Sequence, residues 1–154
     1  MNNLGHWSIY GNLPKDFEVK DYFGFVYIIK NNHTEQYYIG KKQFQHHGSK
    51  KSRHYGREMN WRNYTGSSAA LNADIKKYGK DNFKFLMIDL YKTKGGMYYA
   101  EAYLQMILGC MTEYLSDKQT PRFYNRQIAA IRFVPKEPPT AKTLKFINSF
   151  KRGM

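Results

Sequence analysis

The sequence predicts an α/β fold in which helices pack on a three-stranded, mainly antiparallel β-sheet, with additions at both ends. Two β-rich runs flank a short polar turn, a third apolar run has the length of a strand, and two further segments carry apolar residues at helical spacing. A chain of 154 residues can bury one core, and its single cysteine excludes an intrachain disulfide framework.

The two β-rich runs predict a hairpin over residues 24–42, with its turn centred on Asn32 and His33. With that centre, Tyr27 and Tyr38 lie directly opposite each other. Their Cβ atoms are then about 5 Å apart, and the two hydroxyls converge. Tyrosines are also ordinary strand residues, so the hairpin alone leaves a packing role equally open.

A helix is predicted over residues 69–78, because apolar residues recur there on one helix face: Leu71, Ile75 and Tyr78. Ser67 or Ser68 is expected to cap its start, and Gly79 is expected to end it. The apolar run 83–91 follows as a strand inside the sheet.

Gly95 and Gly96 are expected to break the chain before a second helix, over residues 97–111. Glu101 falls on or beside the apolar stripe of that helix. An unpaired carboxylate there is costly, which implies a nearby cation, an arginine or a metal ion. A carboxylate that reaches solvent at the edge of the stripe is the alternative.

Beyond residue 125 the sequence predicts an extra strand over 128–134 and a stiff proline connector. A short basic helix over 140–152 follows, with Leu144, Ile147 and Phe150 on one side. The expected organisation is therefore a lead-in over 1–23, a main unit over 24–125 and a basic extension over 126–154.

The charge of the chain suggests its partner. Lysine and arginine number 25 against 12 acidic residues, a net charge of +13, which attracts polyanions. Nucleic acid is the leading candidate, with an anionic membrane or simple solubility as alternatives. Many cations gather in residues 45–63, which favours a phosphate-contacting loop or short helix over a mobile solvated loop. The sequence has no signal peptide and no apolar run long enough to span a membrane, so a cytoplasmic protein is expected.

In this order of elements the chain resembles the GIY-YIG nuclease family. The first tripeptide is Phe25-Val26-Tyr27, which keeps only the tyrosine, and the second, Tyr38-Ile39-Gly40, is intact. The two tyrosines are eleven residues apart, a separation typical of the family's hairpin. Residues 66–83 look like the family's central helix and the entry to its third strand. Glu101 stands where its helix-borne glutamate is expected, and Tyr124-Asn125 is similar to its closing element.

The resemblance implies a metal-dependent DNA endonuclease that leaves 5′-phosphate and 3′-hydroxyl ends. Glu101 would hold a single Mg²⁺ or Mn²⁺ ion, Tyr27 would act as the general base, and Tyr38 would lie beside the attacking water. Gly40 and Asn125 would have structural roles. A phenol has an ordinary pKa near 10, so Tyr27 needs nearby positive charge to act as a base at neutral pH. The expected sources are Lys41, Lys42, Arg53 and Arg57.

The family's catalytic arginine has no obvious counterpart, because a longer basic insert follows the second tripeptide. Counting back from Gly66 favours Arg53, with Arg57 one turn later and Arg62 as a further candidate. The residues expected to contact DNA, most simply double-stranded DNA, are Lys41, Lys42, Lys50, Lys51, Arg53, Arg57 and Arg62.

A monomer or a transient homodimer is expected, and restriction-like, homing (intron-associated) and phage DNA-degrading roles are all compatible with the sequence. The main alternative is a catalytically inactive, basic nucleic-acid-binding module. A structural partner of an acidic protein is a third reading.

Overall fold

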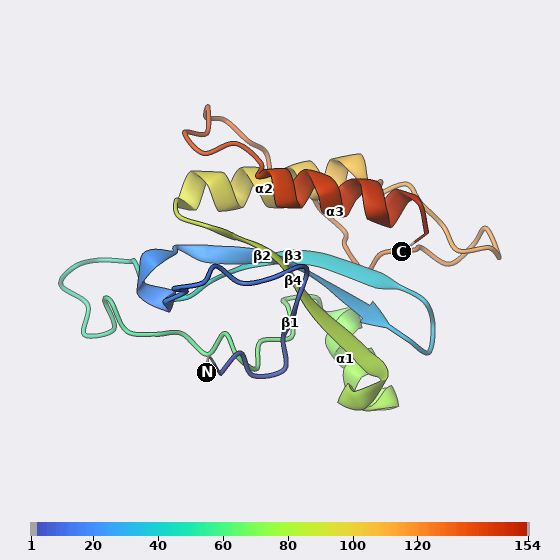
Figure 1. The fold of residues 1–154 in the computed structure, drawn as a ribbon. Helices are drawn as coiled ribbons and strands as arrows, with labels where there is room; N and C mark the ends of the chain where they lie inside the picture. The colour runs from blue at the N-terminus through green and yellow to red at the C-terminus, as the bar shows by residue number, and fades with distance from the viewer. Residues whose placement is uncertain (1–2, 154) are drawn as a thin grey trace.

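A computed structural model describes residues 3–153 of the chain (Figure 1). Its sheet has the strand order β1-β4-β2-β3, with β2 antiparallel to both of its neighbours. The strands are β1 (Ser8–Ile9), β2 (Gly24–Asn31), β3 (Tyr37–Gln43) and β4 (Phe83–Tyr91). The helices are α1 (Ala69–Tyr78), α2 (Lys94–Ile107) and α3 (Ala141–Lys151). The mixed α/β class is confirmed.

The sheet has four strands, where three were expected. The additional strand, β1, pairs parallel to β4 through Ser8 and Ile9. Trp7 precedes it and is buried, and its indole nitrogen donates a hydrogen bond to the carbonyl of Trp61. The lead-in therefore joins the sheet because a buried tryptophan anchors it there.

The expected register of the hairpin is wrong. Tyr27 pairs with Gly40, and Tyr38 pairs with Ile29. The turn is centred one residue later than expected, on His33 and Thr34, where the side chain of Asn31 accepts hydrogen bonds from the backbone of both residues. Tyr27 and Tyr38 are therefore diagonal neighbours on one face of the sheet.

Two cores lie on opposite faces of the sheet. In Figure 1, α2 and α3 cover one face, and α1 lies on the other. Strand β2 contributes to both, because successive side chains point to opposite faces. Val26 and Ile28 pack beneath the helices, whereas Tyr27 packs with the aromatic residues of the other face.

The helix over 69–78 and the strand over 83–91 form with the expected bounds, and Ser68 caps α1 by accepting a hydrogen bond from the backbone of Leu71. The expected bounds of the second helix are wrong, because α2 begins at Lys94 and ends at Ile107. Thr93 caps it by accepting from the backbone N–H of Gly96, 3.0 Å away, so the two glycines lie in its first turn.

The C-terminal segment differs from expectation in two places. Residues 128–134 form no strand, and Val134 is 92% exposed. Glu137, further along this segment, instead accepts hydrogen bonds from the backbone of Lys92 and Thr93 at the start of α2. In α3 the buried apolar residues are Phe146, Ile147 and Phe150, whereas Leu144 is exposed. Over residues 3–153, no helix is long and apolar enough to cross a membrane.

Candidate active site

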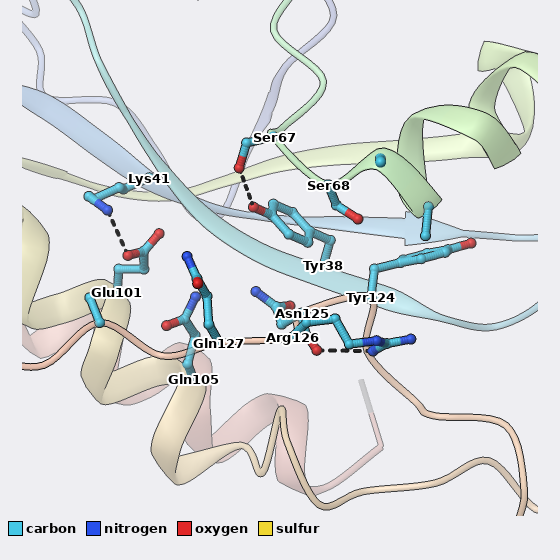
Figure 2. A pocket seen from close by; sticks show the side chains of 13 residues that line it. Tyr38, Lys41, Ser67, Ser68, Glu101, Gln105, Tyr124, Asn125, Arg126 and Gln127 are labelled. Atoms are coloured by element: carbon cyan, nitrogen blue, oxygen red, sulfur yellow. Dashed lines mark hydrogen bonds and ion pairs between the residues drawn. The ribbon is translucent and has the colours of Figure 1, made fainter.

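Two adjoining cavities lie along β3, the edge strand of the sheet. The first, the α1 cavity, has a volume of about 410 Å³ and extends to the start of α1 and to Asn125 (Figure 2). The second, the tyrosine cavity, has a volume of about 280 Å³ and extends to Tyr27 and Tyr64. Four residues line both: Tyr38, Lys41, Ser67 and Glu101. The two cavities therefore form one cleft around these four residues.

Tyr27 reaches the cleft from the neighbouring strand β2 by passing over Gly40. Any Cβ at Gly40 would overlap the hydroxyl of Tyr27, so only glycine leaves room for the phenol to extend to the sheet edge. The ring centroids of Tyr27 and Tyr38 are 6.2 Å apart, in a tilted arrangement. The two tyrosines predicted to converge thus line the same cavity, although they are not directly opposed.

Burial raises the pKa of Tyr27 well above its ordinary value of 10, and the neighbouring Tyr38, Tyr64 and Glu101 raise it further. The expectation that nearby cations favour the phenolate is therefore not met in this structure. Tyr27 carries its proton at neutral pH.

Tyr38 and Tyr64 complete the aromatic wall of the tyrosine cavity. The hydroxyls of Tyr38 and Ser67 lie 3.2 Å apart and share a hydrogen bond. Tyr64 packs edge-on against Tyr27. Sequence reasoning did not place Tyr64 or Ser67 at the site, although it named Ser67 as a possible helix cap, because no periodic pattern marks either residue as a site residue.

Glu101 comes from α2 and is 8% exposed. The Lys41 ammonium donates a hydrogen bond to its Oε1 over 2.8 Å. Burial raises the pKa of Glu101 above its ordinary value of 4.5, and Lys41 opposes that shift. Lys41 also lies 4.2 Å from the centroid of the Tyr98 ring, so a cation–π contact holds it in place.

Lys42 faces the tyrosine cavity, because successive residues of β3 point to opposite faces. Its ammonium lies 4.1 Å from the centroid of the Tyr64 ring. Burial lowers the pKa of Lys42 below its ordinary value of 10.5. A second cation therefore stands beside the tyrosines, on the other side of β3 from Lys41.

Asn125 holds the free edge of β3. Its side-chain oxygen accepts a hydrogen bond from the backbone N–H of Ile39 (3.0 Å), and its amide nitrogen donates to the carbonyl of Ile39 (2.7 Å). The side chain thus takes the place of a neighbouring strand, which fixes the backbone between Tyr38 and Lys41.

The three candidate arginines lie away from the cleft, because none of them lines either cavity. Arg53 and Arg57 are exposed in the irregular segment 44–68, which contains no helix and also carries the exposed Lys50 and Lys51. Arg62 stacks on Trp61 and forms an ion pair with Glu58. Arg126, which was not predicted, lines the α1 cavity.

The residues of the cleft fit a hydrated divalent cation. Among residues 3–153 no three His, Cys, Asp or Glu side chains cluster into a closed metal site, and of the cavity-lining residues only Glu101 is a carboxylate. Mg²⁺ suits such a site, because it keeps several waters and binds through one or two carboxylates together with substrate phosphates. The buried Oε1 of Gln105, one helical turn after Glu101, has no hydrogen-bond partner among the described residues. Gln105 lines the α1 cavity together with Glu101, so its unpartnered oxygen is a further acceptor from the same helix.

Comparison with known proteins gives two matches. The family model described as "Putative endonuclease segE, GIY-YIG domain" matches residues 7–128. The chain is also 30% identical over 112 residues to "Putative endonuclease segC" of Enterobacteria phage T4, a match that covers 73% of this chain and 46% of that protein. The chain therefore spans about half the length of this relative. No solved structure matches it.

Proposed function

This chain belongs to the GIY-YIG endonuclease family, and from that premise we propose that it is a metal-dependent DNA endonuclease. The reaction is hydrolysis of a phosphodiester bond, leaving a 5′-phosphate and a 3′-hydroxyl. One observation carries the proposal: Tyr27, Tyr38 and Glu101, which are far apart in the sequence, line one cavity together.

Hydrolysis of a phosphodiester requires an oriented water, an acceptor for its proton and neutralisation of charge on the phosphate. Tyr27 is the candidate acceptor, and the hydrogen-bonded Tyr38 and Ser67 position the water beside it. Lys42 faces the same cavity and places positive charge near the non-bridging phosphate oxygens.

Glu101 is the residue that holds the divalent cation, Mg²⁺ or Mn²⁺. When bound, such an ion stabilises the negative charge that develops on the phosphate and on the leaving oxygen. Lys41 occupies one oxygen of the carboxylate in this structure. It opposes the effect of burial by favouring the ionised carboxylate, and it orients Glu101 toward the cleft.

DNA approaches along the basic side of the cleft. The exposed cations Lys50, Lys51, Arg53 and Arg57 extend the positive surface beyond Lys41 and Lys42, and they contact the phosphate backbone. Contacts of this kind give affinity without sequence preference.

Two observations favour a second function. The Lys41 ammonium occupies one oxygen of the Glu101 carboxylate, and burial keeps Tyr27 protonated. Both features would also suit an inactive relative that binds DNA through the same basic surface without cutting it.

Incubation of supercoiled plasmid with the protein tests both functions. The enzyme produces nicked DNA in Mg²⁺ or Mn²⁺ and none in EDTA, and end labelling of the product finds a 5′-phosphate. Glu101→Gln binds DNA but cuts at least a hundredfold more slowly. Intact plasmid under all metal conditions, with retained DNA binding, would establish the inactive module instead.

A further inference from the structure

Gln105 is a buried polar residue whose hydrogen-bonding groups are only partly satisfied among the described residues. It lies on α2, is 4% exposed and lines the α1 cavity. Its amide nitrogen donates a hydrogen bond to the carbonyl of Ile39 over 3.1 Å. That carbonyl already accepts from Asn125 over 2.7 Å, so the Gln105 bond adds a second donor to an acceptor that is satisfied without it.

The orientation of the Gln105 amide follows from that contact. A carbonyl oxygen can only accept, so the NH₂ group of the amide must face Ile39, and the oxygen must face elsewhere. The oxygen, Oε1, is buried and has no partner among residues 3–153. A buried acceptor without a partner carries a desolvation cost that an apolar residue here would avoid.

The chemistry of Oε1 restricts what could satisfy it. The atom needs a hydrogen-bond donor, so an ionised phosphate, which only accepts, cannot serve. Glu101 is one helical turn earlier, and residues four apart are neighbours on a helix surface. Figure 2 shows both side chains projecting from α2 into the cavity. A water molecule that is bound to a cation is a donor suited to this position.

On the basis of the function proposed above, we propose that Gln105 is a positioning residue for the divalent cation at Glu101. Its Oε1 accepts a hydrogen bond from one of the ion's water molecules, which fixes the ion against α2. Partners of this outer kind typically contribute 10–100-fold to metal affinity or activity.

The test measures Mn²⁺ binding to the full chain by electron paramagnetic resonance of the free ion. Gln105→Leu should weaken Mn²⁺ binding about 10–100-fold. Gln105→Glu, which places a carboxylate at the same position, should bind Mn²⁺ more tightly than Gln105→Leu. The added carboxylate attracts the ion whatever the role of the glutamine, so the loss of affinity in Gln105→Leu is the result that decides the role. Urea unfolding without metal confirms that each variant folds.

Gln36→Leu is the matched control. Gln36 also donates its amide to a backbone carbonyl, that of Pro121, but lies outside the cleft. The Gln36→Leu variant should bind Mn²⁺ as the wild type does, whereas Glu101→Gln should abolish binding. Wild-type affinity in Gln105→Leu, with binding lost in Glu101→Gln, overturns the role of Gln105 and leaves the proposed function standing. Equal Mn²⁺ binding by the wild type and Glu101→Gln overturns both.

Discussion

Tyr27 and Gly40 illustrate how single residues define the cleft. The phenol extends from an inner strand to the sheet edge only because the residue opposite has no side chain. The same passage buries the phenol, and burial determines its protonation. The packing of Tyr27 over Gly40 therefore also determines the direction in which the pKa of the phenol is shifted.

The pH dependence of cleavage follows from Tyr27. Because its pKa lies well above 10, the phenolate fraction rises about tenfold per pH unit at all pH values near neutrality. If Tyr27 accepts the proton, the single-turnover rate should rise with a slope near one between pH 6 and 8. Tyr27→Phe should lower the rate about 10²–10⁴-fold and abolish the slope.

Tyr64→Phe is the control for that measurement, since it removes a neighbouring hydroxyl from the same cavity. The slope should survive in this variant. A flat wild-type profile, or a slope that persists in the residual activity of Tyr27→Phe, would contradict the assignment of Tyr27 as the base.

Glu101 is expected to reduce stability at neutral pH. Its folded-state pKa is raised above 4.5, so the fold favours the protonated form, and that stabilisation is lost as the pH rises through the raised pKa. The free energy of unfolding of Glu101→Gln relative to that of the wild type should therefore increase between pH 4 and pH 7. Urea unfolding at both pH values measures the difference. A gain that shrinks as the pH rises would contradict the direction of the shift.

At the scale of elements, the irregular segment 44–68 carries arginines for which the sequence left two roles open, catalysis and contact with the DNA backbone. Its cations are exposed, and Arg53 and Arg57 line neither cavity. The segment is thus suited to contact the DNA backbone. The expectation that one of its arginines is catalytic stays a prediction.

Single replacements of Arg53 and Arg57 by alanine distinguish a residue that contacts the DNA backbone from a catalytic residue. Each should weaken DNA binding and reduce the slope of log affinity against log salt by about one. An arginine that only contacts the DNA backbone leaves the single-turnover rate at saturating protein unchanged when it is replaced. Lys145→Ala removes the same charge from α3, which lines neither cavity, and serves as the control. A hundredfold loss of the saturated rate in either variant would identify that residue as the catalytic arginine.

At the scale of the whole molecule, the net charge of +13 and the cleft along β3 together predict the order in which cleavage products appear. A positive charge of this size attracts polyanions whatever their sequence, and if the proposed function holds, one cleft cuts one strand at a time. Nicked circles should therefore accumulate from supercoiled plasmid before linear DNA appears, at a rate proportional to protein concentration. Linear DNA formed without a nicked intermediate would instead indicate two chains acting together.

The sequence by itself determined the elements whose signals are local. Periodicity and caps predicted α1 and β4 with the correct bounds, because those signals act within a few residues. The stripe of α2 placed Glu101 on or beside a buried face and left open whether it pairs with a cation or reaches solvent, and the structure shows it buried and paired with Lys41.

Only the tertiary structure decided how distant parts of the chain meet. The side-chain hydrogen bonds of Asn31 centre the turn on His33 and Thr34, which sets the register of the hairpin, and buried Trp7 anchors β1 in the sheet. Folding also placed Gln105 next to Ile39 and left its oxygen without a partner. Pairing and register depend on loop geometry and on residues far away in the sequence, and no local pattern contains that information.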